Sequence, residues 1–549
     1  MFDSKRRIRG VAIVSAMSVG WALAAACSPA ADRRPGPEPR SVKGAAGLPA
    51  ACDQLDELVR RMSRGHVPDR GADIVPIPNE PTFIGGPISP VHTGPWDHLA
   101  DVPLVAYGPG VVPRVGRVRR PATMADVAPT VARMIGYDFE TPDGEVLEEI
   151  VGADASPPRL VVVVIWDGAG WNVLDAHDED WPFLRRLMRR GGVYTNFEIG
   201  SAPSNTPPIH TTLGTGVFPA RHGIPGVRMR GSSGDSVDPF EGEIADNVEV
   251  PTLADVYDRD TGNRPLIGLV ATVNWHLGMI GHGARFPGGD RDTAVLIDSS
   301  GGSFGNADVY DVGPSPDASM LDHETDALDR ADGEADGRWR QEDLSDLAVR
   351  AASPAFVAFQ QQVLEQTIVS KGFGRDDVPD LMFTNFKMID DSGHKWYPLS
   401  RQVGEAIAAS DAALRRLVRL LDENVGRGRW SVLVTADHGQ QPRPQDTGAW
   451  PVAPGPLGGD VNARFDDNDN GRRLVMGTSA SGLFIDRREA ERLGVSLQDI
   501  ADWLIMYRRK DNLRPGESMP KAWIDDPDQR LFAGIVGGKR LLADSCGDP

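Results

Sequence analysis

Six side chains that could bind metal ions or attack phosphorus stand in four short segments of the chain. They are Asp167, Thr206, Asp390, His394, Asp437 and His438. Each one alone has an ordinary structural explanation, because an Asp after a strand is commonly a turn or cap residue and a lone His is commonly structural. Together they supply carboxylate and imidazole ligands, which Zn²⁺ and similar ions take. The set therefore predicts a site for two metal ions.

Thr206 has a second role to consider, as a nucleophile at the start of a helix. It precedes Pro207, and Pro is favoured at the first helical position because its missing N–H has no helical partner there. As the N-cap, Thr206 would stand beside free N–H groups and the positive end of the helix dipole, which favour a phosphate. The local sequence by itself fits a plain threonine cap better, because such caps are common.

Four apolar segments are predicted to be the strands that position these side chains. They cover residues 102–107, 159–166, 381–386 and 430–435. The run at 159–166 is continuous and mostly β-branched, which is typical of a central parallel strand covered on both faces. Predicted helices at 122–135 and 403–421 alternate with strands, so we expect an α/β fold with a doubly wound, mostly parallel sheet between helices. Ligand sites in such sheets lie at the carboxyl ends of the strands, where Asp167 and Asp437 stand.

The order and spacing of these segments resemble the alkaline phosphatase superfamily, and within it the nucleotide pyrophosphatase/phosphodiesterase branch. Residues 206–210 (TPPIH), followed by 221–224 (RHGI), are similar to the nucleophile region of that branch. Residues 390–394 (DDSGH) match its D-x-x-x-H metal motif, and 435–439 (TADHG) match its T-x-D-H-G motif. The resemblance covers most of residues 80–440, and it implies an alkaline phosphatase-like fold with cap insertions.

One metal ligand that the resemblance implies is absent from its usual place near the C-terminus. No histidine follows residue 440. The strand that the family places after this ligand, V-P-L-x-x-Y-G-P-G, stands instead at residues 102–110, and His92 precedes it. We therefore expect a circular permutation in which residues 80–150 supply the elements that the family places last, since permutation is tolerated where chain ends lie close together. The spacing favours His92 as the ligand over His98.

The resemblance implies two divalent ions, with Zn²⁺ favoured by the His and Asp ligands. Its two ligand sets are His92, Asp390 and His394 for one ion, and Asp167, Asp437 and His438, with the Thr206 oxygen nearby, for the other. One ion would lower the pKa of the Thr206 hydroxyl, which would attack phosphorus and form a phosphothreonine intermediate that water then hydrolyses.

The activity implied is that of a metal-dependent phosphodiesterase or nucleotide pyrophosphatase, acting on a small phosphate ester or nucleotide. Two alternatives stay open. The first is a phosphomonoesterase on the same scaffold. The second is a surface lipoprotein that only binds, which predicts an incomplete set of metal ligands.

A departure from the branch's pattern concerns the phosphate-binding donor. The branch usually has an Asn shortly after H-G-I, whereas residues 222–227 read HGIPGV. The donor is therefore absent or supplied from elsewhere, for example by Asn205, and the choice between diester and monoester stays open. His276 and His282 either line the substrate pocket or are packed structural histidines.

Length and charge bound the class of protein. A chain of 549 residues is long enough for one large α/β domain with insertions. Its net charge of -20 argues against general binding to nucleic-acid duplexes, because the chain would repel a phosphate backbone. A small phosphate substrate is compatible with this charge, since bound metal ions reverse the local field.

The first residues are expected to be an export signal. A basic start is followed by an apolar run over 11–26, which is short for a membrane span. The segment 1–27 resembles a lipoprotein signal with Cys27 as the lipidated residue, and the alternative is an ordinary secretory signal. The protein is thus expected to be exported, and to be extracellular or anchored at the cell surface through lipid on Cys27, which would be its only link to a membrane.

Residues 28–50 are rich in Pro, Ala, Gly and Arg and are expected to be a linker to a catalytic domain over 51–549. Within this domain, 298–352 and 440–535 are predicted insertions. Cys52 and Cys546 could form one disulfide in an oxidising compartment or stay unpaired, and the sequence does not decide between these states.

Overall fold

The structure is a computed structural model. It describes residues 50–79, 82–85, 92–152, 156–232, 234, 236–467, 469–479, 481–513 and 526–547. The predicted leader with Cys27, and all but the last residue of the predicted linker, lie outside the described residues. Among the described helices, none is long and apolar enough to span a bilayer.

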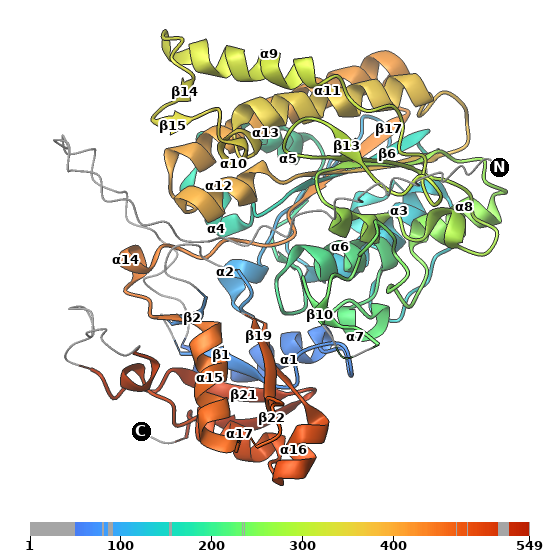
Figure 1. Ribbon diagram of the computed structural model, residues 1–549. Helices are drawn as coiled ribbons and strands as arrows, with labels where there is room; N and C mark the ends of the chain where they lie inside the picture. Colours follow the sequence, from blue (N-terminus) through green and yellow to red (C-terminus); the bar gives the residue numbers. More distant parts are fainter. Residues whose placement is uncertain are drawn as a thin grey trace, which may run out of the picture. The chain divides into compact units, whose positions relative to one another are not determined.

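A nine-stranded sheet lies at the centre of the larger part of the chain (Figure 1). In spatial order its strands are β13 (Ser303–Phe304), β12 (Thr293–Ile297), β11 (Ile267–Ala271), β16 (Asp380–Phe386), β6 (Leu160–Trp166), β17 (Trp430–Thr435), β3 (Leu104–Tyr107), β7 (Gly192–Tyr194) and β4 (Gly116–Val118). The five strands from β12 to β17 are parallel, whereas β3 is antiparallel to both of its neighbours. The predicted mostly parallel α/β sheet is confirmed.

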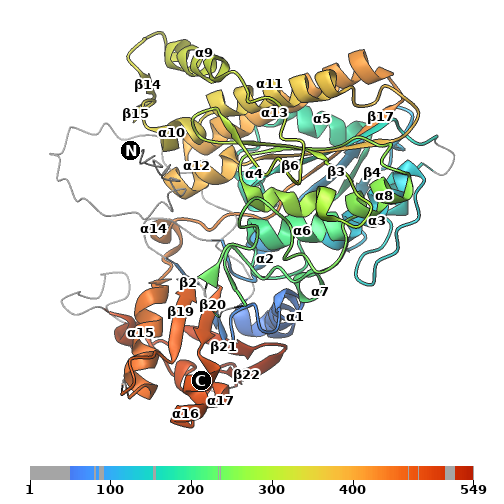
Figure 2. The same ribbon diagram turned by 45° about the vertical axis from the view of Figure 1, so that its right-hand side comes forward.

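Helices cover both faces of this sheet (Figures 1 and 2). One face carries α5 (Pro182–Arg190), α11 (Pro354–Lys371) and α13 (Arg401–Leu421), and the other carries α3 (Val127–Ile135), α6 (Thr206–Thr215) and α8 (Leu253–Asp260). The central strands β6 and β16 are buried along their whole length. Apolar strands of this kind stay out of water only when helices lie on both sides.

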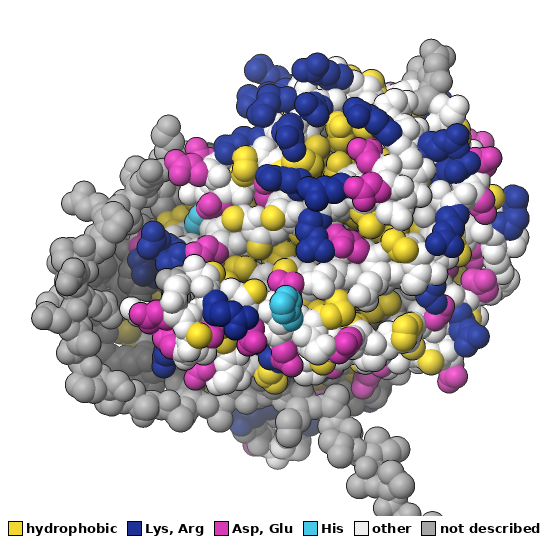
Figure 3. Space-filling model, turned by 90° about the horizontal axis from the view of Figure 1, so that it is seen from above, with side chains coloured by type: hydrophobic (Ala, Val, Ile, Leu, Met, Phe, Trp, Pro, Cys, Tyr) yellow, Lys and Arg dark blue, Asp and Glu magenta, His cyan; other side chains and the backbone are white. Residues whose placement is uncertain are grey.

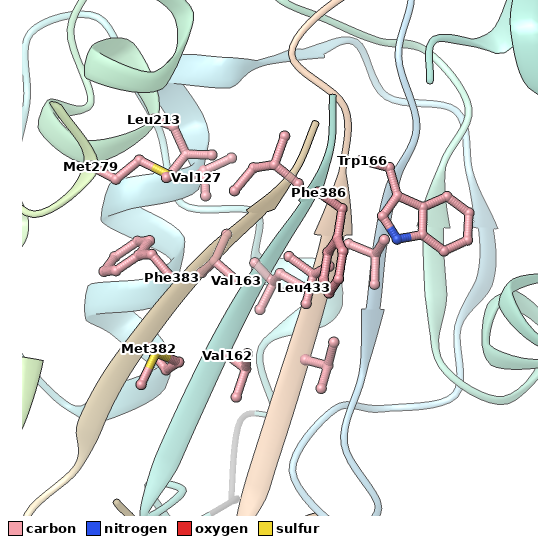
Figure 4. Close-up of a cluster of buried hydrophobic side chains, with 14 of the residues drawn as sticks. Val127, Val162, Val163, Trp166, Leu213, Met279, Met382, Phe383, Phe386 and Leu433 are labelled. Atoms are coloured by element: carbon pink, nitrogen blue, oxygen red, sulfur yellow. The ribbon is translucent and has the colours of Figure 1, made fainter. Parts of the chain in front are cut away.

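The core consists of side chains from neighbouring strands and from the helices above and below them. Figure 4 shows Val162 and Val163 of β6 beside Phe383 of β16 and Leu433 of β17, with Leu213 of α6 on one side. Burial of each such side chain stabilises the fold by about 1.5–3 kcal/mol relative to exposure. The packing fixes the positions of the strand ends, where the polar residues follow.

The predicted helix at 122–135 is wrong in its first turn. Residues Ala122–Thr123 form β5, Met124–Asp126 form a 3-10 turn, and α3 begins at Val127. The reason is a capping box, in which the Thr123 backbone N–H donates to Asp126 Oδ2 at 2.7 Å. This local bond ends the strand and sets the start of the helix.

The predicted insertion at 298–352 holds α9 (Ala318–Asp329), β14 (Arg338–Trp339), β15 (Glu342–Asp343) and α10 (Leu347–Ala351). Helix α9 packs against α11. Seen from above, this face of the molecule has Lys and Arg side chains gathered on one part of it, with acidic side chains more scattered (Figure 3). The net charge of -20 is therefore unevenly distributed.

A second, smaller hydrophobic core joins the two ends of the described chain. Its elements are α15 (Pro454–Phe465), β19 (Val475–Ser479), β20 (Gly482–Ile485), α16 (Arg487–Leu493), α17 (Leu497–Leu504), β21 (Phe532–Gly537) and β22 (Arg540–Asp544), together with Ile74 and Ile84 from the start of the domain. Helix α1 (Leu55–Gly65) and strand β1 (Val75–Pro78) contribute to a separate hydrophobic cluster that also includes residues of β21. Strand β1 pairs with β21 in an antiparallel sheet. The predicted insertion at 440–535 thus folds together with residues from the start of the domain.

Cys52 and Cys546 form a disulfide, with their Cα atoms 5.3 Å apart and 494 residues between them in sequence. We expect reduction with dithiothreitol to lower the melting temperature, because the cross-link restricts the unfolded chain and contributes about 2–5 kcal/mol in typical cases. Thermal unfolding of the oxidised and reduced protein measures this effect. The double variant Cys52→Ala/Cys546→Ala is the control, and a drop of the same size in that variant on reduction would contradict the assignment.

Candidate active site

The polar strand-end residues gather at one edge of the sheet. Asp167 directly follows β6, and Asp437 and His438 follow β17. Asp390 and His394 lie on α12 (Met388–Trp396), which follows β16. Because these three strands are adjacent and parallel, their carboxyl ends meet, and the side chains that follow them lie close together.

Thr206 is the first residue of α6, and all ten residues of this helix are buried. The expectation that Thr206 is the N-cap is wrong by one residue, since Asn205 holds that position with extended backbone and makes no side-chain cap bond. The two prolines that follow Thr206 occupy the first turn, where no helical hydrogen bond is lost. The Asn205 side-chain oxygen is buried without a hydrogen-bond partner among the described residues.

One group of metal-ligating atoms is formed by His92, Asp390 and His394. His92 Nε2 lies 3.2 Å from His394 Nε2 and 3.5 Å from Asp390 Oδ1, and His394 Nε2 lies 3.4 Å from Asp390 Oδ2. A tetrahedral Zn²⁺ site with bonds of about 2.0–2.1 Å has edges of about 3.3 Å between ligand atoms. The spacing of the three side chains therefore fits a metal ion at the centre.

The other ring nitrogen of His92 explains its orientation. Nδ1 bonds to the Ser204 carbonyl oxygen at 2.7 Å, which leaves Nε2 directed at the other ligands. Burial lowers the pKa of His92 to about 3, so the imidazole is neutral and can offer a lone pair. A second bond of this kind is the usual way in which proteins orient a metal-binding histidine.

A second group is formed by Asp167, Asp437 and His438. His438 Nε2 lies 3.5 Å from Asp167 Oδ1 and 3.4 Å from Asp437 Oδ2, while its Nδ1 bonds to the Gly439 carbonyl oxygen at 2.9 Å. These separations again match the edges of a tetrahedral site.

Three ligand atoms of the two groups are buried without a hydrogen-bond partner among the described residues. They are Asp390 Oδ1, Asp437 Oδ2 and His438 Nε2. A buried polar atom without a partner costs about 1–3 kcal/mol. Bound cations would remove this cost at all three atoms, so the donor set fits two metal ions.

Lys387 is a further charged group that the sequence analysis missed. Its Nζ donates to Asp390 Oδ2 at 2.8 Å and to Asp167 Oδ1 at 3.2 Å, and it lies 3.5 Å from Thr206 Oγ1. Burial opposes the charge, but Asp167 and Asp390 raise the pKa of Lys387 well above its usual value. The signal for Lys387 in the sequence was its position directly after the strand predicted at 381–386 and three residues before Asp390.

Asp167 also contacts a pair of buried residues through its other oxygen. Asn385 Nδ2 donates to Asp167 Oδ2 at 2.9 Å and to His210 Nε2 at 2.8 Å. His276 Nε2 lies 3.7 Å from the same Asp167 oxygen, and neither of its ring nitrogens has a hydrogen-bond partner among the described residues. His276 is thus next to the site.

His282 is a packed structural histidine, which was one of the two roles predicted for it. Its Nδ1 bonds to Asp255 Oδ2 at 2.9 Å and its Nε2 to the Val248 carbonyl oxygen at 3.1 Å. His98 lies outside the ligand groups, with its Nε2 3.3 Å from Gln441 Oε1. Of the two early histidines, the structure brings His92 to Asp390 and His394.

The comparisons with known proteins agree with the geometry. The family model for Type I phosphodiesterase / nucleotide pyrophosphatase matches residues 161–453, which is more than half of the chain. Alkaline phosphatase PafA from Elizabethkingia meningoseptica is 23% identical over 157 residues, which is 27% of this chain and 28% of that protein.

The crystal structure of wild-type alkaline phosphatase PafA has a TM-score of 0.50 at 17% sequence identity, covering 69% of this chain and 84% of that one. Phosphonoacetate hydrolase from Sinorhizobium meliloti 1021 has a TM-score of 0.31 at 22% identity, covering 51% and 57% of the two chains. The first of these structures supports an alkaline phosphatase-like fold.

We expect His92→Ala to lower the zinc content of the purified protein by about one ion per chain, because it removes one of three ligands of a single site. His98→Ala is the matched control and should retain the full content. Metal analysis by mass spectrometry after dialysis measures both. Equal zinc content in the two variants would show that His92 is not a ligand.

Proposed function

This chain belongs to the Type I phosphodiesterase / nucleotide pyrophosphatase family, and we propose that it is a phosphate-ester hydrolase that acts through a covalent intermediate on Thr206. The observation that carries this proposal is the position of Thr206 Oγ1. It lies 3.5 Å from the ammonium group of Lys387, which contacts one carboxylate of each ligand group. This contact supports a position of the hydroxyl near both groups.

The two ligand groups would hold two divalent ions, and Zn²⁺ is the ion that this set of carboxylates and imidazoles suits best. When bound, such ions lower the pKa of a nearby hydroxyl and neutralise the charge of a phosphate. The alternative of a protein that only binds predicts an incomplete set of metal ligands. In contrast, the three Asp and three His side chains predicted as ligands gather in two groups of three.

The residues of the chain have distinct tasks in the proposed reaction. The Thr206 hydroxyl gives its proton to solvent and its Oγ attacks phosphorus, so that an Oγ–P bond forms and the bond from phosphorus to the leaving oxygen breaks. The leaving alcohol or phosphate takes a proton from solvent. Water then attacks the phosphothreonine and releases Thr206 with its proton restored. At the start of α6, Pro207 and Pro208 carry no backbone N–H, so the Thr206 N–H and the positive end of the helix dipole are what this end offers to the phosphate oxygens.

The proposed substrates are phosphodiesters or nucleotide pyrophosphates, in line with the description of the family. A specific observation favours a second candidate, the phosphomonoesters. Lys387 places a positive charge near the nucleophile, and a monoester dianion gains more from this charge than a diester monoanion does. The absence of the Asn after residues 222–224 points in the same direction, as does the similarity to an alkaline phosphatase.

Circular permutation and export are part of the proposal. The family match begins at residue 161, yet His92 lies beside Asp390 and His394, and β3 pairs with β17 inside the sheet. These features support the permuted order of residues 80–150.

The disulfide between Cys52 and Cys546 is typical of an oxidising compartment, which supports an exported enzyme.

We expect Thr206→Ala to lower kcat/KM by at least about 10³-fold, because it removes the attacking oxygen. Thr206→Ser keeps a hydroxyl and should retain much more activity. Steady-state rates on p-nitrophenyl phosphate and bis(p-nitrophenyl) phosphate, with zinc content measured on the same samples, give the comparison. Undiminished turnover by a zinc-loaded Thr206→Ala protein would exclude Thr206 as the nucleophile.

Lys387→Met should reduce kcat/KM for the monoester more than for the diester, by an extra factor on the order of ten, because the lost charge matters more to a dianion. Lys387→Arg keeps the charge and serves as the control. The ratio of the two kcat/KM values is the readout. An unchanged ratio in Lys387→Met would mean that Lys387 does not contribute to the choice of substrate.

A further inference from the structure

A second group of carboxylates lies away from the active site, at the opposite edge of the sheet. Asp258 is in the last turn of α8, and Asp290 and Asp292 lie in the segment that leads into β12. One oxygen of each of the three side chains lies within 4.8 Å of the others. Because β12 belongs to the parallel strands of the sheet, its start lies at the amino edge, whereas the metal-ligating groups described above follow the carboxyl ends.

The side chain of Asp292 is 7% exposed, and within the described part of the chain it has neither a hydrogen bond nor an ion pair. Only its backbone carbonyl is engaged, as the acceptor for Asp311 N at 2.9 Å. A buried carboxylate in this state is costly unless a cation lies beside it. Asp292 therefore points to a ligand that its own chain does not supply.

The neighbouring arginines are committed elsewhere. Arg259 bonds to Asp260, at 2.7 Å, and lies over the ring of Phe286. Arg291 donates to the Ala307 carbonyl oxygen at 3.3 Å. Burial, together with the charges of Asp290 and Asp255, raises the pKa of Asp258 to about 7. Among the described residues, no arginine or lysine forms an ion pair with Asp258, Asp290 or Asp292, so a bound cation is what would favour their ionised forms.

The side-chain amide of Asn263 and the Gly288 carbonyl oxygen lie next to Asp258. One of its two amide atoms lies 3.2 Å from the Gly288 carbonyl oxygen and 3.1 Å from Asp258 Oδ2. If this atom is the amide nitrogen, it donates to both oxygens. If it is the amide oxygen, three oxygens face one another, which is the arrangement found around a bound cation. The orientation of the amide is then set by whether a cation is present.

We propose that Asp258, Asp290 and Asp292 bind a calcium ion, with the Asn263 side-chain oxygen and the Gly288 carbonyl oxygen as further ligands. Ca²⁺ takes six to eight oxygen ligands from carboxylates, amides, backbone carbonyls and water, whereas Zn²⁺ prefers the nitrogen-containing sets of the active site. The ion links α8 to the segment before β12, so it stabilises the fold at this edge and takes no part in catalysis.

A third acidic group serves as a comparison, because an arginine of the same chain compensates its charge. Asp466, Asp467 and Glu489 also lie within 4.8 Å of one another. Arg492, however, forms ion pairs with Asp467 and Glu489. This group is neutralised by its own chain, so Asp467 offers a matched control.

The test uses the zinc-loaded protein in calcium-free buffer. Isothermal titration with CaCl₂ should give one site per chain for the unchanged protein and for Asp467→Asn, and no binding for Asp292→Asn. Excess calcium should raise the melting temperature of the first two by about 2–5 °C and leave that of Asp292→Asn unchanged.

The variants also separate a lost site from a failure to fold. Without calcium, Asp292→Asn should melt at the same temperature as the unchanged protein or above it, because a buried repulsion is removed. Asp290→Asn changes an exposed residue and should weaken calcium binding at least tenfold. Absence of binding by the unchanged protein, or binding of one calcium ion by both Asp292→Asn and Asp290→Asn as tight as in the control, would overturn the proposal.

Discussion

The buried carboxylates Asp167, Asp390 and Asp437 at the carboxyl edge of the sheet have to be balanced by positive charge, and the surrounding structure is organised around this requirement. Each is no more than 1% exposed. Lys387 bridges two of them, and burial and this lysine act in opposite directions on the pKa of Asp167, with the net effect a lowering. One ammonium group cannot balance three carboxylates, and the orphaned ligand atoms around them are the places where further cations fit.

The rigidity of the site comes from the sheet below it. Strands β6, β16 and β17 are adjacent, parallel and buried, so the residues that follow them are held at fixed separations. A second layer of hydrogen bonds then orients the side chains, as with His92 on the Ser204 carbonyl and Asn385 between Asp167 and His210. Preorganised ligands of this kind lose little freedom when a metal ion or a phosphate binds.

Three acidic groups in the described part of the chain have three different surroundings. At the carboxyl edge, Lys387 and the ligand geometry leave room for metal ions. In the smaller core, Arg492 pairs with Asp467 and Glu489. At the amino edge, Asp292 forms no ion pair with a lysine or an arginine among the described residues. In the smaller core, an arginine of the same chain compensates the negative charge. At the amino edge, the proposed calcium ion takes that role, although the two clusters have similar residue types.

The sequence was sufficient to predict the central strands and to name the side chains that follow them and gather at one edge of the sheet. The apolar, β-branched run of β6 and an Asp after its end are local features, because burial on both faces and the end of a strand each leave a mark within a few residues. His92 was identified through the short motif that follows it. The wrong first turn of the helix before Gly136 and the shift of the N-cap from Thr206 to Asn205 lay within the usual uncertainty of helix boundaries.

Only the tertiary structure decided which groups meet across long distances in the chain. It placed Lys387 between Asp167 and Asp390, put His276 beside the site and His282 on Asp255, paired Cys52 with Cys546, and brought Asp258 to Asp292. A local pattern records how one segment is buried, but it carries no information on strand order or on the direction of a ring nitrogen. Those depend on the packing of the whole domain, which is why the residue types could be read in advance and their partners could not.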